Sequence, residues 1–141
     1  MNAPVLLVTG GSRGIGAATA LLAAREGWDV ALNYARDAQA AENVAAQVRA
    51  LGRRALVLQG DVGQEREVLA MFAAIDAEFG ALRGLVNNAG VVDLPQRVDA
   101  MSVERLQRMF AINVTGSFVC AREAIKRMST LHGGSGGAIV N

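Results

Sequence analysis

Short apolar runs alternate with longer amphipathic segments along the whole chain. The run at residues 5–9 is ended by glycines, which is typical of a strand buried on both faces. In the longer segments, apolar residues recur every three or four positions, which predicts helices. Strands are expected at residues 5–9, 29–34, 55–59 and 138–140, with a strand and turn at 84–90. Helices are expected at 14–26, with Ile15, Ala18 and Leu22 along one face, around 41–51 and 68–79, and over about 102–131.

Five strands separated by helices indicate a parallel sheet, because parallel neighbours need a crossover connection. Right-handed crossovers then make a doubly wound α/β sheet the expected architecture. A chain of 141 residues is long enough for one domain and too short for two. The last strand, Ala138–Val140, also has the pattern of a buried strand, so covering segments are expected after it.

Composition and charge exclude several classes of protein. Fourteen Lys and Arg stand against thirteen Asp and Glu, a balance that gives no electrostatic footprint for nucleic acid or an anionic membrane. No run of 18 apolar residues is present, and the start of the chain lacks the basic region of a signal peptide. One cysteine, Cys120, excludes an internal disulfide and a multi-cysteine metal site. The chain is therefore expected to be a cytoplasmic, soluble protein without a metal.

A glycine-rich loop, TGGSRGIG at residues 9–16, joins the first strand to the first helix. Glycines let the backbone turn sharply and let a pyrophosphate approach the amides, and the helix adds its free N–H groups and dipole. The alternative is a tight turn without a ligand, but the position after the first strand of a βαβ unit favours nucleotide binding. A P-loop is excluded because GxxxxGK[ST] is absent. The residues expected at the nucleotide are Gly10, Ser12, Arg13, Gly14, Ile15 and Gly16.

Four motifs in sequence order resemble those of the short-chain dehydrogenase/reductase family. They are Thr9-Gly10-x-x-x-Gly14-x-Gly16, Asp61-Val62, Asn87-Asn88-Ala89-Gly90 and Asn113-Val114-Thr115-Gly116. The set is similar to that of bacterial 3-oxoacyl-carrier-protein reductases and sugar dehydrogenases. The resemblance implies that residues 1–141 are the N-terminal portion of a single Rossmann-type NAD(P)-binding domain. It also implies hydride transfer between a nicotinamide and a small-molecule carbonyl or secondary alcohol.

The same resemblance implies roles for individual residues, each with a simpler alternative. Asp61 and Val62 would contact the adenine, although Asp61 alone could cap the following helix. Asn87, Ala89 and Gly90 would lie at the cofactor, although this stretch could be an ordinary turn. Asn113 would be catalytic, through a water that relays protons. Its alternative is hydrogen bonding within the core, since an asparagine inside a helix needs partners for its amide.

The end of the second strand decides between the two nicotinamide cofactors. NAD enzymes usually place an acid there to bind the ribose hydroxyls, and the family's position falls at about Tyr34. Asp37 lies nearby but is expected to begin the next helix. Arg13 and Arg36 suit a 2′-phosphate because guanidinium groups bind phosphate through paired hydrogen bonds, although Arg36 could also be a solvated surface charge. NADP(H) is therefore favoured, and NAD(H) stays an alternative.

Part of the catalytic machinery that the resemblance implies has no match in these residues. The family uses a serine, a tyrosine and a lysine four positions after it, where the lysine lowers the pKa of the tyrosine. The only tyrosine, Tyr34, is followed at that distance by Ala38, and the only lysine is Lys126. The serine and Tyr-x-x-x-Lys are expected beyond residue 141 with the last strands and helices. Neither His132 nor Cys120 is expected to replace them.

Two other classes of function stay open from the sequence. The chain could be a nucleotide-binding fragment or truncated product without turnover, which agrees with the expectation that these 141 residues alone are inactive. It could also bind a flavin or another nucleotide. The resemblance further implies a homo-oligomer, a tetramer or dimer, with the helix at 102–131 in the interface. The alternative for that helix is packing against the sheet.

Overall fold

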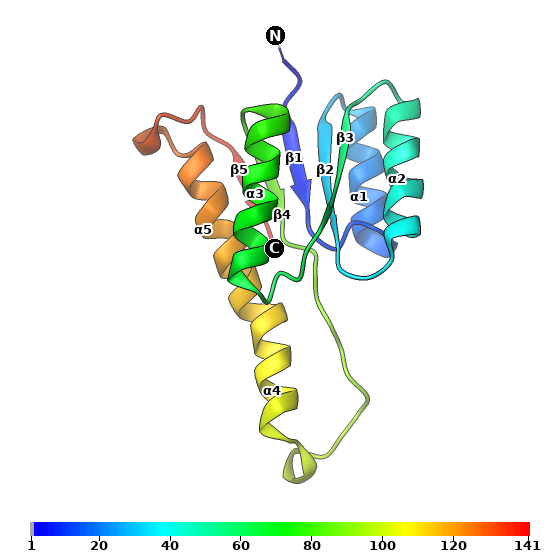
Figure 1. Ribbon diagram of the computed structural model, residues 1–141, viewed down its shortest axis with the longest axis vertical. Coiled ribbons are helices and arrows are strands. Elements are labelled where there is room, and N and C mark those ends of the chain that lie inside the picture. The colour runs from blue at the N-terminus through cyan, green and yellow to red at the C-terminus, as the bar shows by residue number, and fades with distance from the viewer. Residues whose placement is uncertain (1) are drawn as a thin grey trace.

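Five short strands form one parallel sheet in the computed structural model, which describes residues 2–141 (Figure 1). The strand order is β3-β2-β1-β4-β5, and every neighbouring pair is parallel. This arrangement confirms the predicted α/β doubly wound sheet. The strands are β1 Val5–Val8, β2 Asp29–Tyr34, β3 Ala55–Gln59, β4 Gly84–Val86 and β5 Ala138–Val140. The helices are α1 Gly14–Arg25, α2 Ala38–Ala50, α3 Glu65–Phe79, α4 Val103–Phe110 and α5 Gly116–Met128, with short turns η1 Val98–Ala100, η2 Ala111–Thr115 and η3 Thr130–His132.

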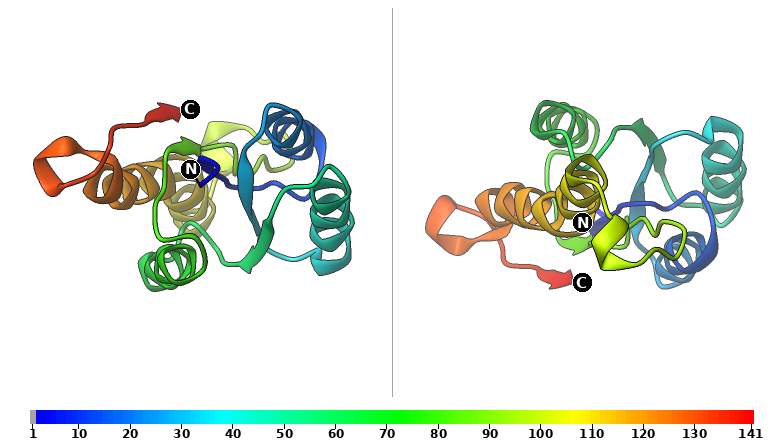
Figure 2. Two further views of the ribbon diagram at one scale, coloured as in Figure 1. Left: turned by 90° about the horizontal axis from the view of Figure 1, so that it is seen from above. Right: turned by 90° about the horizontal axis from the view of Figure 1, so that it is seen from below.

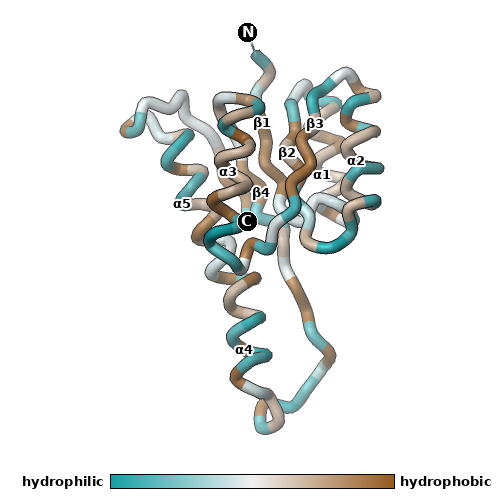
Figure 3. The backbone as a smooth tube through the Cα atoms, in the orientation of Figure 1, coloured by the Kyte–Doolittle hydropathy of each residue, from teal (hydrophilic) through white to brown (hydrophobic). Residues whose placement is uncertain are grey.

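Helices cover both faces of the sheet, so the central strands are apolar throughout. Successive residues of β1 point to opposite faces: Leu7 packs in a core under α3 and α5, while Leu6 and Val8 pack in a second core under α1 and α2. Figure 2 shows the two helical layers, and Figure 3 shows the most hydrophobic positions gathered along β1, β2 and β3. Burial of every side chain of β1 explains why its sequence shows no alternation.

Helix α1 packs with a different face from the one expected. Ile15 is 79% exposed and Ala18 and Leu22 are exposed too, so the predicted apolar face points away from the sheet. The buried positions are Gly16, Ala20 and Ala24. The prediction was wrong because α1 is apolar almost all round, so its sequence has no polar face to orient it. Small residues then decide the packing, because they let the helix axis approach the sheet closely.

The helical segment expected over about 102–131 runs from Val103 to Met128 and changes character along its length. Its first part, α4, has no buried residue and projects beyond the end of the sheet (Figure 1). A π-helical turn, η2, joins it to α5, which buries Cys120, Ala124 and Met128 against α3 and the sheet. Packing against the sheet therefore describes α5 but not α4. Within residues 2–141, no helix is at once long and apolar enough to cross a membrane.

An ionic network joins α5 to α3. The carboxylate of Glu123 is 5% exposed and accepts hydrogen bonds from Lys126 Nζ at 2.8 Å, Arg122 Nε at 3.0 Å and Arg127 Nη1 at 3.2 Å. Arg127 also pairs with Asp76 of α3 at 2.7 Å, and its guanidinium lies 4.9 Å from the ring centre of Phe72. A carboxylate buried in this way is tolerated because it is paired and hydrogen-bonded.

The last strand is less buried than its sequence predicts. β5 pairs only with β4, at one edge of the sheet. Ile139 packs on the core under α5, but Val140, on the opposite face, is 58% exposed. No helix among residues 2–141 covers this end of the sheet on the α1 side, so the strand is uncovered there, and the covering segments expected after it stay a prediction.

Candidate functional site

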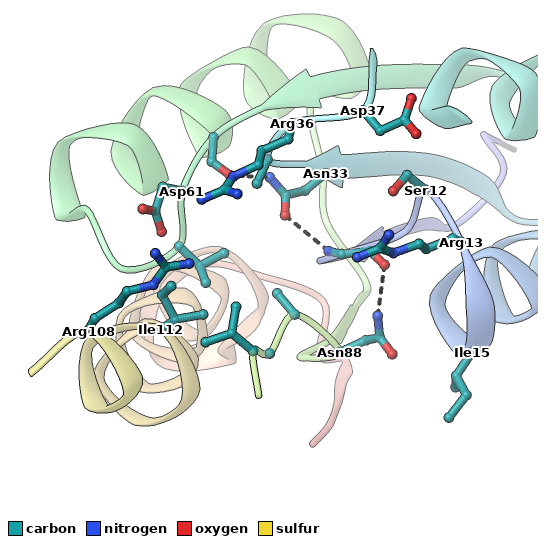
Figure 4. Close-up of a pocket in the computed structure, with 17 residues that line it drawn as sticks. Ser12, Arg13, Ile15, Asn33, Arg36, Asp37, Asp61, Asn88, Arg108 and Ile112 are labelled. Carbon is teal, nitrogen blue, oxygen red and sulfur yellow. Dashed lines mark hydrogen bonds between the residues drawn. The ribbon is translucent and has the colours of Figure 1, made fainter. Parts of the chain in front are cut away.

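A cleft of about 690 Å³ opens at the carboxyl ends of β1, β2, β3 and β4 (Figure 4). This is the edge at which parallel α/β sheets bind ligands, and the volume is that of a small-molecule site. Most residues that were expected at a nucleotide line it, namely Gly10, Ser12, Arg13, Ile15, Arg36, Asp61, Val62, Ala89 and Gly90. Gly14, Gly16 and Tyr34 do not line it, and Asn87 and Asn113 line a neighbouring recess.

The glycine loop folds tightly enough that two of its glycines are required. Gly10 has a φ of +61°, and a Cβ there would lie 2.9 Å from Ala89 Cα. A Cβ on Gly16 would overlap the carbonyl oxygen of Gly10 and lie 2.5 Å from Asn88 Nδ2. Arg13 is the N-cap of α1, and neither a side-chain cap nor an acidic residue occupies the first turn. The first N–H groups of α1 therefore have no side-chain cap, and the residues beside them, Ser12, Arg13 and Ile15, line the cleft. Uncapped N–H groups at a helix start are the arrangement that binds anions.

The turn after β4 is tied to the glycine loop. Thr9 Oγ1 accepts hydrogen bonds from the backbone N–H groups of Asn88 at 3.1 Å and Ala89 at 3.0 Å. Asn88 Nδ2 in return donates to the carbonyl oxygens of Thr9 at 3.0 Å and Gly10 at 2.9 Å. Residues 87–90 thus do more than reverse the chain, because they fix the position of the loop that begins at Gly10.

Asp61 belongs to the turn between β3 and α3, not to the helix cap. Its Oδ1 accepts from Gly63 N at 2.8 Å, whereas the N-cap of α3 is Gln64. The helix-capping alternative for Asp61 is therefore wrong. Figure 4 shows the Asp61 carboxylate at one end of the cleft, with Val62 beside it in the chain.

Three arginines line the cleft: Arg13 from the glycine loop, Arg36 after β2 and Arg108 from α4 (Figure 4). Within residues 2–141, none of their guanidinium groups pairs with a carboxylate. Asp37 also lines the cleft, but its Oδ1 accepts from Ala40 N at 2.9 Å as the N-cap of α2, as predicted. Tyr34 packs toward α1 and α2 instead.

Asn113 lies in the π-helical turn η2, and its side-chain amide bonds both backbone groups of one residue, Val91. Its Oδ1 accepts from Val91 N at 2.7 Å, and its Nδ2 donates to Val91 O at 2.8 Å. Asn113 is exposed, so its amide has hydrogen-bond partners but does not lie in the core as the alternative supposed, and its catalytic role stays a prediction. The recess beside it, of about 440 Å³, also contains Asn87, whose Nδ2 donates to Ser117 O at 3.1 Å and to Asn141 Oδ1 at 2.9 Å.

Comparison with known proteins places this arrangement in a family. The chain matches the short chain dehydrogenase family over residues 4–141. It belongs to that family.

Members of the short-chain dehydrogenase family resemble the chain in sequence and in structure. The uncharacterized oxidoreductase YgfF of Escherichia coli (strain K12) is 52% identical over 137 residues, which are 97% of this chain and 56% of that protein. The acetoin dehydrogenase of Enterobacter cloacae superposes with a TM-score of 0.91 at 33% identity, over 99% of this chain and 54% of that one. A Burkholderia cenocepacia J2315 short chain dehydrogenase in complex with NADP gives 0.84 at 37% identity, over 88% and 50%. The chain thus spans about half the length of the family members it matches.

The family motifs do not account for every residue of the cleft. Asn33, Ala35, Gly60, Val91, Arg108 and Ile112 line it as well, and the sequence did not single them out. Asn88, which also lines the cleft, lies in a family motif but was given no role of its own. Arg108 and Ile112 are one helical turn apart, a spacing that places them on the same side of the segment ahead of Asn113. Gly60 directly precedes Asp61, and Asn33 directly precedes Tyr34. Among residues 2–141 no group of three His, Cys, Asp or Glu residues could hold a metal ion.

Proposed function

We propose that the chain is the cofactor-binding part of an NADP(H)-dependent oxidoreductase that transfers hydride between the nicotinamide and a carbonyl or secondary alcohol. The observation that carries the proposal is the cleft at the carboxyl ends of the strands, which is lined by the glycine loop, including Arg13, and by Arg36 after β2. The family membership and the NADP complex of a relative support it. In this proposal residues 1–141 are the N-terminal portion of a single Rossmann-type domain, and a cytoplasmic location stays a prediction.

Different residues of the cleft would bind different parts of the cofactor. The first N–H groups of α1 and Ser12 would hold the pyrophosphate, since a helix N-terminus favours anions. Asp61 and Val62 would meet the adenine, and the turn at Asn87, Ala89 and Gly90 would meet the nicotinamide half. When bound, the nicotinamide supplies or accepts the hydride. Asn113 stands beside that turn, where its side-chain amide is hydrogen-bonded to the backbone of Val91.

The preference for a 2′-phosphate rests on charge. Arg13 and Arg36 both reach the cleft without a carboxylate partner among residues 2–141, and such guanidinium groups bind phosphate through two parallel hydrogen bonds. Tyr34 packs against the core under α1 and α2, does not line the cleft, and has no carboxylate for the ribose hydroxyls. Asp37 is occupied in capping α2. An unphosphorylated ribose therefore finds fewer partners here than a phosphorylated one.

The test is to measure the affinity of NADPH and NADH for the wild type, Arg13→Ala and Arg36→Ala. Hydrogen bonds to a charged group contribute about 1.5–3 kcal/mol, so each substitution should weaken NADPH binding about 10- to 100-fold and leave NADH nearly unchanged. Arg25→Ala is the matched control, because Arg25 is exposed at the far end of α1 and outside the cleft. Unchanged NADPH affinity in both cleft variants would reject these roles.

We propose further that turnover needs residues beyond those of this chain. The serine and the Tyr-x-x-x-Lys pair expected beyond residue 141 would supply the acid and base. The alternative function, nucleotide binding without turnover, is what these 141 residues alone would then show. Carbonyl-dependent oxidation of NADPH by the 141-residue polypeptide would contradict this proposal.

The assembly proposed is a homo-oligomer, a tetramer or dimer, formed through α4 and α5. Val103, Leu106 and Phe110 are exposed apolar residues on α4, and Phe118 on α5 is 75% exposed. Apolar residues gathered along one exposed helical segment are typical of an interface. Sedimentation of the wild type against Phe118→Asp tests this: the wild type should be oligomeric and the variant smaller. A wild-type monomer at all concentrations would reject the interface.

A further inference from the structure

Asn33 is the buried polar residue that connects two walls of the cleft. It lies near the end of β2, is 2% exposed, and lines the cleft between the glycine loop and the turn before Asp61 (Figure 4). A buried amide without hydrogen bonds is costly, so the partners of Asn33 show what the residue holds.

One wall is the glycine loop. Asn33 Oδ1 accepts from Gly10 N at 3.1 Å, and the backbone oxygen of Asn33 accepts from Gly11 N at 2.8 Å. The carbonyl oxygen of the same Gly10 accepts from Asn88 Nδ2 at 2.9 Å. Two asparagine amides, one from β2 and one after β4, therefore hold the N–H and the C=O of Gly10. Its N–H is consequently not free for a ligand.

The other wall is the turn that follows β3. Asn33 Nδ2 lies 3.0 Å from Gly60 O and 3.3 Å from Leu58 O, and Gly60 N donates to Tyr34 O at 2.9 Å. Met71 Sδ, 3.0 Å from Asn33 Nδ2, closes the site from α3. Since Gly60 directly precedes Asp61, the same amide that positions the glycine loop also positions the turn that carries Asp61.

We propose that Asn33 is a positioning residue that fixes the separation of these two walls, and that the Gly10 N–H does not bind the cofactor's phosphates. The inference rests on the proposed NADP(H) site and adds to it a residue outside the family motifs. Asn33 acts through Gly10 and Gly60, so its removal should loosen the ligand-free cleft before any nucleotide enters.

The first test uses the wild-type protein alone and measures, by NMR, the rate at which the Gly10 amide hydrogen exchanges with solvent. We expect this amide to be protected without nucleotide and to stay protected when NADPH binds. If it instead exchanges freely in the free protein and becomes protected only with NADPH, then it is a phosphate donor and the proposal is overturned. This reading does not depend on any variant folding.

The second test compares Gly10 amide exchange and NADPH affinity in Asn33→Ala, Asn33→Asp and the control Val44→Ala. Asn33→Ala removes both sets of hydrogen bonds, so Gly10 exchange should quicken and NADPH affinity should fall about tenfold or more, the equivalent of one lost hydrogen bond. Asn33→Asp keeps an acceptor for Gly10 N–H but sets a carboxylate against the Gly60 carbonyl, so Gly10 should stay protected while affinity falls. Val44 is a buried residue of α2 in the core under α1 and α2, and it does not line the cleft. Val44→Ala should lower thermal stability and change neither the exchange of the Gly10 amide nor the affinity for NADPH.

The outcomes separate this inference from the proposed function. A wild type that does not bind NADPH refutes the proposed function, and Asn33 is then judged on Gly10 exchange alone. A wild type that binds NADPH, with Asn33→Ala binding it equally and Gly10 still protected, refutes the positioning role and leaves the proposed function standing. Equal loss of affinity in Asn33→Ala and Val44→Ala would mean that only general destabilisation is at work, which also refutes it.

Discussion

Gly16→Ala should damage both the stability of the fold and the cofactor cleft. An added Cβ would overlap the carbonyl oxygen of Gly10 and lie 2.5 Å from Asn88 Nδ2 and 3.0 Å from Gly11 Cα. None of these neighbours can move freely. Gly10 is held by Asn88 and Asn33, and Asn88 Nδ2 is itself engaged with Thr9. The methyl group must therefore push α1 and the glycine loop apart.

The size of the effect follows from these contacts. Overpacking a rigid site costs about 1–3 kcal/mol. Breaking the hydrogen bond from Asn88 to Gly10 adds about 1 kcal/mol. The free energy of unfolding should therefore fall by about 2–4 kcal/mol, which at this chain length is a decrease of roughly 8–16 °C in Tm. Movement of Gly10 also shifts the wall of the cleft, so NADPH affinity should fall with stability.

Thermal unfolding followed by circular dichroism and an NADPH fluorescence titration measure the two effects. Gly52→Ala is the matched control: Gly52 has a φ of +78° after α2, and a Cβ there would have no atom within 4 Å. A left-handed backbone costs an alanine about 1–2 kcal/mol, so this variant should also melt earlier but bind NADPH normally. If Gly16→Ala melts with the wild type and binds NADPH equally well, the packing argument for the loop is refuted.

Two further predictions concern titrating groups in α5. Burial alone would raise the pKa of Glu123, but hydrogen bonds from Lys126, Arg122 and Arg127 outweigh it and hold the pKa below its ordinary value of 4.5. Its contribution to stability is thus present above that value and is lost as the pH falls through the lower, folded-state pKa. Glu123→Gln should therefore lose less stability on acidification than the wild type, and equal slopes in pH-dependent unfolding would contradict this. Burial raises the pKa of the Cys120 thiol to about 11, so iodoacetamide should label it only in denaturant; rapid labelling of the native protein would contradict its burial.

The sequence alone located the glycine loop and the strands because their signals are local. The spacing of the glycines is visible in the sequence, but the contacts that require Gly10 and Gly16 include Asn88 and Ala89 of the turn after β4, which only the fold brings close. The orientation of α1 could not be predicted in this way. Its residues are apolar all round, so the choice of Ala20 and Ala24 over Leu22 depends on how closely the sheet lets the helix approach.

Asn33 and Arg108 could not be found from spacing, because each reaches the cleft through tertiary structure. Asn33 meets Gly10 only because β2 lies next to β1, and meets Gly60 only because β3 lies next to β2. Arg108 meets the cleft only because α4 passes the turn that carries Asp61. The strand order β3-β2-β1-β4-β5 is a property of the folded sheet, and the sequence pattern leaves it open.

The contacts within the cleft make the proposed nucleotide binding separable from the proposed turnover. The part of the cleft proposed to hold the adenosine is built from the loops after β1, β2 and β3, which Asn33 and Asn88 hold together without any residue of β5. The recess at Asn113 is built differently, since Asn141, directly after the edge strand β5, contributes to it through Asn87. Binding should therefore survive changes at β5 that alter the recess. The affinity of this chain for NADPH is consequently a test of the proposed cofactor site, and the test holds whether or not the polypeptide is catalytically active.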